Sequence, residues 1–336
     1  MGRLGTVMKR ALIVGVDQYP GSPLHGCVAD AQAMAAVLGR HEDGSRNYEV
    51  RLVTSDGSYV DRATLRMGLA ELFENARGAD LLFYFAGHGA ETPWGADLVT
   101  VDARPNSLGV SMNDVITLAN ASPAQEVVVI LDCCYSGDLA NAPGLQAGAV
   151  APAFRLGQAL LREGMTVLAA ARSTETSTES GGHGAFTRVL LEGLEGAAAD
   201  HIGHVTALSL YAFASRAFGA WEQRPVFKSH VAEPTVLRIC QPVIDAELLR
   251  ALPQHFTTAE ARVPMSPAHE GQRPISPEQQ PTTEQQEFDY FKQLRNAGLL
   301  TTDNNNDLYF VAMESKEVYL TVTGRYFWRL AADCKL

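Results

Sequence analysis

Short apolar runs alternate with segments of helical periodicity over the first two thirds of the chain. Several runs are apolar at every position, as expected for strands of a parallel sheet that helices cover on both faces. Alternating strands and helices predict a single α/β domain. The predicted strands are 10–16, 49–53, 79–86, 126–132, 165–170 and 235–239.

Amphipathic helices are predicted between these strands. The clearest is 61–77, whose Leu, Phe and Ala residues recur at helical spacing and whose first residue, Asp61, is a favourable N-cap. The other predicted helices are 27–38, 185–194 and 207–218.

The composition changes after residue 240, which we take as the end of the first domain, 1–240. Residues 241–283 hold seven prolines and many Gln, Ser and Thr residues, so they are predicted to be a Pro/Gln-rich linker. Apolar patterning then predicts a helix (FDYFKQLRNAGLL), two strands (LYFV and VYLTV) and a final helix (GRYFWRLA). Residues 284–336 are therefore expected to form a small α+β, winged-helix-like module.

The charge balance narrows the classes of partner. The chain has 27 basic and 38 acidic residues, a formal net charge of -11, whereas nucleic acids and anionic membranes need clustered Lys and Arg. The module 284–336 also has an acidic excess, so it is predicted to dock a protein rather than DNA. We expect no nucleic-acid partner and no membrane partner. The run 11–16 is too short for a signal-peptide core, which favours a cytoplasmic location.

The five cysteines do not form the pattern of a disulfide framework or a zinc ribbon, because their number is odd and no C-x-x-C pair occurs. Motifs of P-loop NTPases, HExxH zinc proteases, serine hydrolases and zinc deaminases are also absent from the sequence. These enzyme classes therefore lack support in the sequence, and at least one cysteine is a candidate for reactivity.

Two predicted strands end in residues with useful chemistry. The strand 79–86 continues into Gly-His-Gly, with His88 at its centre, and the strand 126–132 continues into two cysteines, the second being Cys134. Functional groups gather beyond the carboxyl ends of parallel strands, so we expect these two side chains to face each other. An imidazole can take a thiol proton and later protonate a leaving amine. The alternative is a buried cysteine and a packing histidine with no chemistry.

The strings FYFAGHG and VVILDCCYSG resemble the His and Cys motifs of caspase-like cysteine peptidases, closest to metacaspases and bacterial caspase homologues. The string AARSTETSTESGGHGAFTRVLLEGL resembles the small-subunit segment of the same family. The resemblance implies Cys134 as nucleophile and His88 as base and acid, and the amides of Gly89 and Cys134 would form the oxyanion hole. One departure is Tyr135, which stands where the family frequently has His.

The same resemblance divides the first domain and implies its fold, a mostly parallel sheet flanked by helices. Residues 10–137 would be the large-subunit-like part, 138–164 the intersubunit loop and 165–240 the small-subunit-like part. Arg155 and Arg162 are the only basic residues of the loop, so cleavage there would be a self-consistent activation of a zymogen. The alternative places both arginines on a helix surface.

Two carboxylates are candidates for the pocket that binds the residue before the scissile bond. Asp132 lies two residues before the nucleophile, and Asp30 ends the string GCVAD, in which Ala29 replaces the Asn of the family motif. The resemblance implies cleavage of proteins or peptides after Arg or Lys, because a pair of carboxylates favours a cation. The alternatives are a solvated helix residue for Asp30 and a hydrogen-bonding role for Asp132.

Further roles follow only from the resemblance. Glu175 and Glu179 are the candidates for calcium binding, but the dense acidic cluster of the family is missing, so we expect no cofactor and no calcium requirement. The rim that contacts the substrate backbone corresponds to Ala171, Arg172, Ser173 and Thr174, for which an ordinary surface loop is the alternative.

The resemblance also implies a biological setting, that of a regulated effector in bacterial stress or antiphage defence. A regulator or an activating protease would dock on 284–336. The competing hypothesis is a catalytically silent caspase-like scaffold that acts in assembly through this module.

Overall fold

The computed structural model describes residues 7–92, 95–105, 107–134, 160–170, 184–218, 225–270 and 280–336. The chain forms two compact units. The sheet unit comprises Met1–Ala199 and His204–Gln241, and the C-terminal unit comprises Asp200–Gly203 and Pro242–Leu336. The sheet unit therefore ends at the boundary where the composition of the sequence changes.

The described part of the sheet unit is built on an eight-stranded, mostly parallel sheet with the order β2-β1-β3-β6-β7-β9. The first five of these strands run parallel, and β9 closes the edge in the antiparallel direction. This arrangement confirms the predicted α/β fold. The strands are β1 (Lys9–Gly15), β2 (Glu49–Thr54), β3 (Asp80–Thr92), β6 (Glu126–Cys134), β7 (Met165–Ala169) and β9 (Val226–His230).

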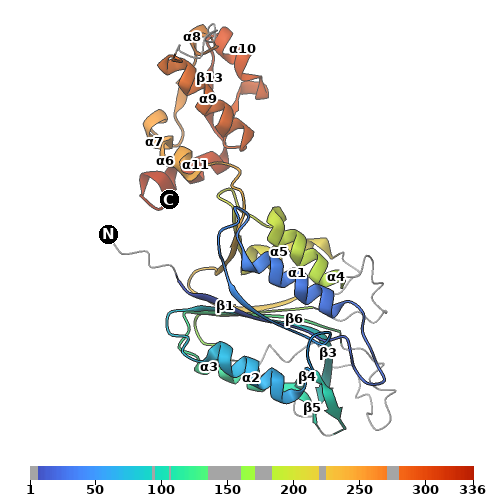
Figure 1. Cartoon of the computed structure of the whole chain (residues 1–336). Coiled ribbons are helices and arrows are strands. Elements are labelled where there is room, and N and C mark those ends of the chain that lie inside the picture. The colour runs from blue at the N-terminus through green and yellow to red at the C-terminus, as the bar shows by residue number, and fades with distance from the viewer. Residues whose placement is uncertain are drawn as a thin grey trace. The chain divides into compact units, whose positions relative to one another are not determined.

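Helices cover both faces of the sheet, which explains why its central strands have long continuous apolar stretches (Figure 1). Phe83 of β3 and its alternate neighbours pack against α2 and α3. Tyr84 and its alternate neighbours pack against α1, α4 and α5. These helices are α1 (Cys27–Gly39), α2 (Arg62–Phe73), α3 (Met112–Ala121), α4 (Ala185–Glu192) and α5 (Ala207–Ala217).

The start of α2 was correctly predicted, because the Asp61 side chain accepts a hydrogen bond from the Thr64 N–H at 2.8 Å. The helix ends at Phe73, before the predicted residue 77. Glu74 is extended and Asn75 has a positive φ of 50°, so the chain leaves the helix although its apolar spacing continues.

Several elements of the sheet unit were not expected. The strands β4 (Gly95–Arg104) and β5 (Ser107–Ser111) form an antiparallel extension on the end of β3. A π-helical turn (Gly193–Ala197) follows α4. The predicted strand 235–239 is β10 (Val236–Ile239), but it pairs with β8 (His204–Thr206) in a separate two-stranded sheet.

The C-terminal unit has its own core around a three-stranded antiparallel sheet of order β11-β13-β12. Trp328 of α11 donates a hydrogen bond to the Phe256 carbonyl at 2.7 Å and so ties the last helix to the start of the unit. The elements are α6 (Ala246–Arg250), α7 (Leu252–His255), β11 (Arg262–Pro264), α8 (Pro267–Glu270), α9 (Thr283–Asn296), β12 (Leu300–Thr302), a 3₁₀ turn (Asp303–Asn305), α10 (Leu308–Met313), β13 (Glu317–Leu320) and α11 (Val322–Ala332).

The prediction of a linker over 241–283 is wrong for residues 242–270. Leu252, Phe256 and Met265 are buried in the same core as Phe288. Three of the four prolines in 242–270 stand where regular structure tolerates them: in the first turn of α7, at the start of α8 and on the edge strand β11.

The predicted strand LYFV is also wrong, since these residues begin α10. Asp307 caps this helix by accepting a hydrogen bond from the Tyr309 N–H at 2.9 Å. Leu308, Val311 and Ala312 are buried at helical spacing. A four-residue apolar run fits a strand and a short helix equally well, and here the cap favours the helix. The winged-helix-like classification of the module stays a prediction.

Within the described residues, no helix combines the length and the apolar content that crossing a bilayer requires.

Candidate functional site

The last pair of the parallel register between β3 and β6 places His88 next to Cys134. The two strands are parallel neighbours, and His88 and Cys134 are register partners across them. Neighbouring strands lie about 4.8 Å apart. Gly89 follows His88 on the same strand, so the two backbone amides expected to stabilise an oxyanion also lie on adjacent strands.

The imidazole of His88 is buried, with 1% of the residue exposed, and its orientation is fixed by a backbone oxygen. The Nε2 atom lies 2.8 Å from the carbonyl oxygen of Ser22. A carbonyl only accepts hydrogen bonds, so Nε2 carries the proton. The neutral ring then has its lone pair on Nδ1, the form in which Nδ1 can act as a base.

Tyr19 holds the backbone of His88, whereas Ser22 holds its imidazole. Its hydroxyl accepts a hydrogen bond from the His88 N–H at 3.1 Å and donates one to the Val99 carbonyl at 3.2 Å. The two rings are also in contact, with centroids 4.6 Å apart. Burial raises the pKa of Tyr19 well above its usual value, so the hydroxyl keeps its proton. A side chain at Gly87 would collide with this hydroxyl.

The loop that carries Ser22 and Tyr19 is held by Asp17. The Asp17 carboxylate accepts hydrogen bonds from the N–H groups of Cys27 at 2.9 Å and Val28 at 3.2 Å, the first two residues of α1. The Asp17 carbonyl accepts hydrogen bonds from the N–H groups of Tyr19 and Leu24. One aspartate thus ties the loop to the helix that carries Asp30.

The structure brings Asp30 and Asp132 together at the start of α4. Asp30 is 2% exposed and Asp132 is 9% exposed. A Cβ atom built on Gly184 would lie 3.1 Å from Oδ2 of Asp30 and 3.2 Å from Oδ2 of Asp132. The Gly184 N–H donates a hydrogen bond to the same Asp30 oxygen at 3.1 Å. Asp30 is therefore not a solvated helix residue.

Asp132 is bound by a chain of hydroxyl groups. Thr187 Oγ1 donates a hydrogen bond to Asp132 Oδ2 at 2.6 Å, and the Tyr84 hydroxyl lies 2.6 Å from the same Thr187 atom. Burial raises the pKa of Asp132 to about 6; the Thr187 hydrogen bonds oppose this shift, and the negative charge of Asp30 adds to it. The carboxyl group is ionised at neutral pH and titrates just below it.

Sequence reasoning missed the residues that surround the predicted ones. Tyr19 lies between the predicted strand 10–16 and the predicted helix 27–38, where no motif marked it, and Ser22 acts through its backbone, which leaves no signal in the sequence. Thr187 and Gly184 lie within the small-subunit-like string, but no pattern distinguished them from their neighbours.

Arg162 is the only predicted processing residue within the described part of the chain. Its guanidinium donates hydrogen bonds to the carbonyls of Ala119 at 3.1 Å and Ala124 at 3.0 Å, and also to that of Glu163. These contacts fasten the segment before β7 to α3 and to the loop between α3 and β6, and they weigh against cleavage after Arg162. They also differ from the expected alternative of a helix-surface charge.

The other predicted residues lie outside the described part of the chain, or their side chains do. The side chain of Cys134 is among these, so the geometry above concerns its backbone. Residues outside the described ranges are Tyr135, Arg155, Ala171, Arg172, Ser173, Thr174, Glu175 and Glu179.

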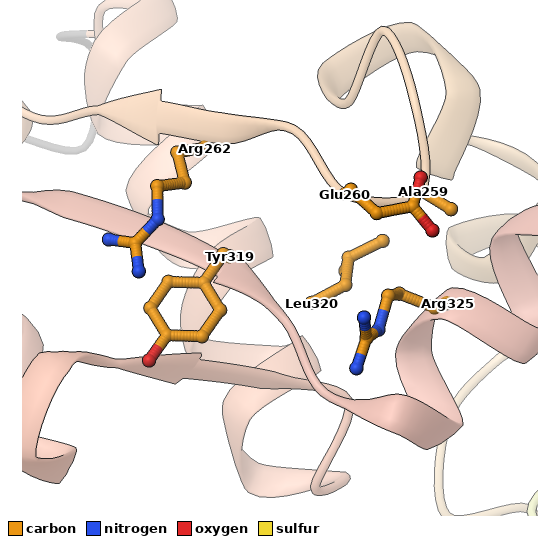
Figure 2. A pocket seen from close by; sticks show the side chains of 6 residues that line it. All are labelled: Ala259, Glu260, Arg262, Tyr319, Leu320 and Arg325. Atoms are coloured by element: carbon orange, nitrogen blue, oxygen red, sulfur yellow. The ribbon is translucent and has the colours of Figure 1, made fainter.

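A shallow hollow in the C-terminal unit is lined by no cysteine, serine or histidine (Figure 2). The Arg262 guanidinium covers the Tyr319 ring, 4.2 Å from its centroid, and makes two hydrogen bonds of 3.1 Å to Asp303. The charge of Arg262 is thus already compensated. The lining residues are Ala259, Glu260, Arg262, Tyr319, Leu320 and Arg325.

Comparison with known proteins gives three kinds of similarity. The sequence matches the family model of the caspase domain over residues 8–236. Metacaspase-3 of Trypanosoma cruzi is 27% identical over 150 residues, which are 40% of this chain and 42% of that protein. Metacaspase-1A of Aspergillus oryzae is 26% identical over 155 residues, 41% of this chain and 36% of that protein. The chain thus matches less than half the length of these curated relatives.

A solved structure of a protein from Geobacter sulfurreducens superposes with a TM-score of 0.47 at 16% sequence identity. The match covers 70% of this chain and 98% of that chain.

Proposed function

Because the chain belongs to the caspase-domain family, we propose that it is a cysteine endopeptidase that hydrolyses proteins after Arg or Lys. The observation that carries the proposal is the register pairing of His88 with Cys134 on adjacent strands. Two buried carboxylates near these strand ends supply the specificity.

The reaction would begin with transfer of the Cys134 thiol proton to Nδ1 of His88. The thiolate attacks the carbonyl carbon of the scissile bond, and the amides of Gly89 and Cys134 stabilise the oxyanion, a contribution of about 3 kcal/mol for a single donor. The imidazolium then gives its proton to the leaving amine, which departs and leaves a thioester. Water, activated by His88, hydrolyses the thioester and restores the thiol.

The carbonyl of Ser22 supports this cycle at each step. It holds Nε2–H in a hydrogen bond of 2.8 Å, so the same nitrogen remains the donor while Nδ1 takes and returns the proton. The partial negative charge of the carbonyl oxygen also stabilises the imidazolium. No carboxylate is needed for this role.

The pair Asp30 and Asp132 favours a cationic residue before the scissile bond. Two buried carboxylates repel an Asp side chain, and they attract a guanidinium or an ammonium group. Arg should be preferred to Lys, because its planar fork can bond both carboxylates at once.

A catalytically silent scaffold is the second candidate function. The observation that favours it is a group of exposed apolar side chains on α10 of the C-terminal unit: Tyr309, Phe310 and Met313. A scaffold of this kind would bind a partner without any cysteine-dependent turnover. In the peptidase interpretation the same unit is where a regulator docks.

The test is turnover of fluorogenic peptides that carry Arg, Lys, Asp or Asn before the scissile bond, with and without calcium. The matched variants are Cys134→Ala and Cys133→Ala, because Cys133 is the neighbouring cysteine but is buried in the core on the α2 and α3 face. We expect turnover of the Arg and Lys peptides by the wild type and by Cys133→Ala, and none by Cys134→Ala. Absence of turnover in every condition would favour the scaffold.

A further inference from the structure

The first turn of α4 binds both carboxylates of the proposed specificity pocket. Gly184 donates its N–H to Asp30, and Thr187 donates its hydroxyl to Asp132, which also accepts the Thr187 N–H. The positive end of the helix dipole lies at the same place and favours negative charge there. The two acidic side chains therefore owe their common position to a helix from the small-subunit-like part of the chain.

The direction of the hydroxyl chain depends on the charge of Asp132. A carboxylate only accepts hydrogen bonds, so with Asp132 ionised the Thr187 proton points to Asp132, and Tyr84 donates its own proton to Thr187. Both bonds are 2.6 Å long, and Thr187 and Tyr84 are fully buried. In a buried environment the charge-assisted bond from Thr187 stabilises the carboxylate strongly, and the bond from Tyr84 polarises the Thr187 hydroxyl.

Gly184 leaves free space beside the two carboxylates because it has no Cβ atom. A methyl group at this position would contact an oxygen of each carboxylate at 3.1 and 3.2 Å, closer than a Cβ atom normally packs. The backbone of Gly184 has φ -64° and ψ 141°, which an alanine adopts without strain. The need for glycine here is therefore one of space beside the two carboxylates.

We propose that Thr187, supported by Tyr84, is the positioning residue that keeps Asp132 charged in the pocket, and that Gly184 keeps the approach to both carboxylates open to a cation. The inference rests on the proposed function and assigns three further specificity residues to it. The alternative is that the hydrogen bonds only cap α4 and have no influence on substrate choice.

The test compares two isosteric peptides, one with arginine and one with uncharged citrulline before the scissile bond, over pH 5 to 9. The ratio of their kcat/KM values cancels the titration of Cys134 and His88, which is common to both peptides. For the wild type, the ratio should fall in acid with a midpoint near 6, where Asp132 takes up a proton. A wild type without preference for arginine would refute the proposed function itself.

Thr187→Val should move the midpoint of the ratio upward by about one to two pH units, because the charged carboxylate loses a hydrogen bond. At pH 6.5 a shift of one unit reduces the ratio about threefold, and the ratio recovers by about pH 9. Thr187→Ser keeps the hydroxyl and should retain the wild-type midpoint. Tyr84→Phe should shift the midpoint in the same direction by a smaller amount. This variant tests the role of the hydroxyl chain if Thr187→Val does not fold.

Gly184→Ala should lower the ratio about tenfold at every pH, through a higher KM for the arginine peptide, and alkaline pH should not restore it. Turnover of the citrulline peptide serves as the check that the dyad is intact. A midpoint that stays unchanged in Thr187→Val and Tyr84→Phe, or an unchanged ratio in Gly184→Ala, would overturn the corresponding part of the proposal.

Discussion

The carbonyl oxygen of Ser22 lies 2.8 Å from Nε2 of His88, so a loop outside the sheet sets the tautomer of a histidine inside it. The same loop contributes Tyr19, whose hydroxyl holds the His88 backbone. The 17–26 loop thus fixes both the backbone and the imidazole of His88. Substitutions in this loop should therefore lower kcat although the loop residues do not contact the substrate.

Tyr19→Phe should lower both stability and kcat. The variant removes the acceptor of the His88 N–H and the donor to the Val99 carbonyl, and loss of a buried hydrogen-bond partner costs about 1 to 3 kcal/mol. We expect a loss of about 2 kcal/mol in the free energy of unfolding, measured by urea denaturation, and a fall in kcat of about tenfold with little change in KM. Tyr59→Phe is the control, since Tyr59 is 65% exposed. A normal kcat in Tyr19→Phe would contradict the positioning role.

Asp17→Ala should reduce activity more than an equally destabilising change elsewhere. Asp17 and Asp61 both accept hydrogen bonds at a helix start, so removal of either side chain should cost about 1 kcal/mol of stability. Only Asp17 fixes the loop that orients His88, and only Asp17→Ala should lower kcat. Equal kinetic effects in Asp17→Ala and Asp61→Ala would show that loss of stability alone is responsible.

Asp132→Asn should stabilise the protein at neutral pH and abolish its preference for Arg. The pKa of Asp132 is raised from 3.8 to about 6, so the native state binds more protons than the unfolded state between these values. The free energy of unfolding therefore falls as pH rises from about 4 to 6, by about 3 kcal/mol for this group.

The difference in the free energy of unfolding between Asp132→Asn and the wild type should accordingly grow from pH 4 to pH 7. Urea denaturation at four pH values measures it, with Asp56→Asn as the control at an exposed position of the same unit. Parallel stability curves for Asp132→Asn and the wild type would mean that burial does not shift the Asp132 pKa as described.

Arg162→Ala should destabilise the chain by about 2 kcal/mol even when the nucleophile is removed, because three backbone carbonyls lose a donor. Its effect on thermal unfolding is best measured in the Cys134→Ala background. For the same reason we expect self-cleavage of 138–164 to occur after Arg155 and not after Arg162. Intact-mass analysis of the active protein identifies the site, and a product ending at Arg162 would contradict this expectation.

The strand and helix order of the sheet unit was predictable, because strands that are buried on both faces have continuous apolar runs in the sequence. The central residues of β1, β3, β6 and β7 (11–14, 81–86, 127–131 and 167–169) are continuously apolar, and strand ends in such sheets carry function. This reasoning predicted that His88 and Cys134 lie on neighbouring strands, as their register pairing shows. Asp132 was a candidate from its spacing to Cys134 and from the resemblance to a family, and Asp30 from the resemblance alone.

The remaining features depend on contacts that a sequence pattern does not record. The Ser22 carbonyl is a backbone atom that any residue would provide. Nothing in the sequence distinguishes Thr187 from a surface threonine, because its contact with Asp132 depends on where α4 packs. In the C-terminal unit, the prolines of 242–270 suggested a linker, and the core formed by Phe256 and Met265 outweighs them.

Covalent labelling tests the central claim, a Cys134–His88 dyad beside an acidic pocket, most directly. The protein would be treated with an arginine-containing peptidyl electrophile and with its aspartate analogue, and the adducts located by peptide mapping. We predict one adduct per chain, on Cys134, formed with the arginine compound alone and slowed at least 100-fold in His88→Ala. Labelling of Cys133 instead, equal reaction with both compounds, or a rate unaffected by His88→Ala would contradict the account.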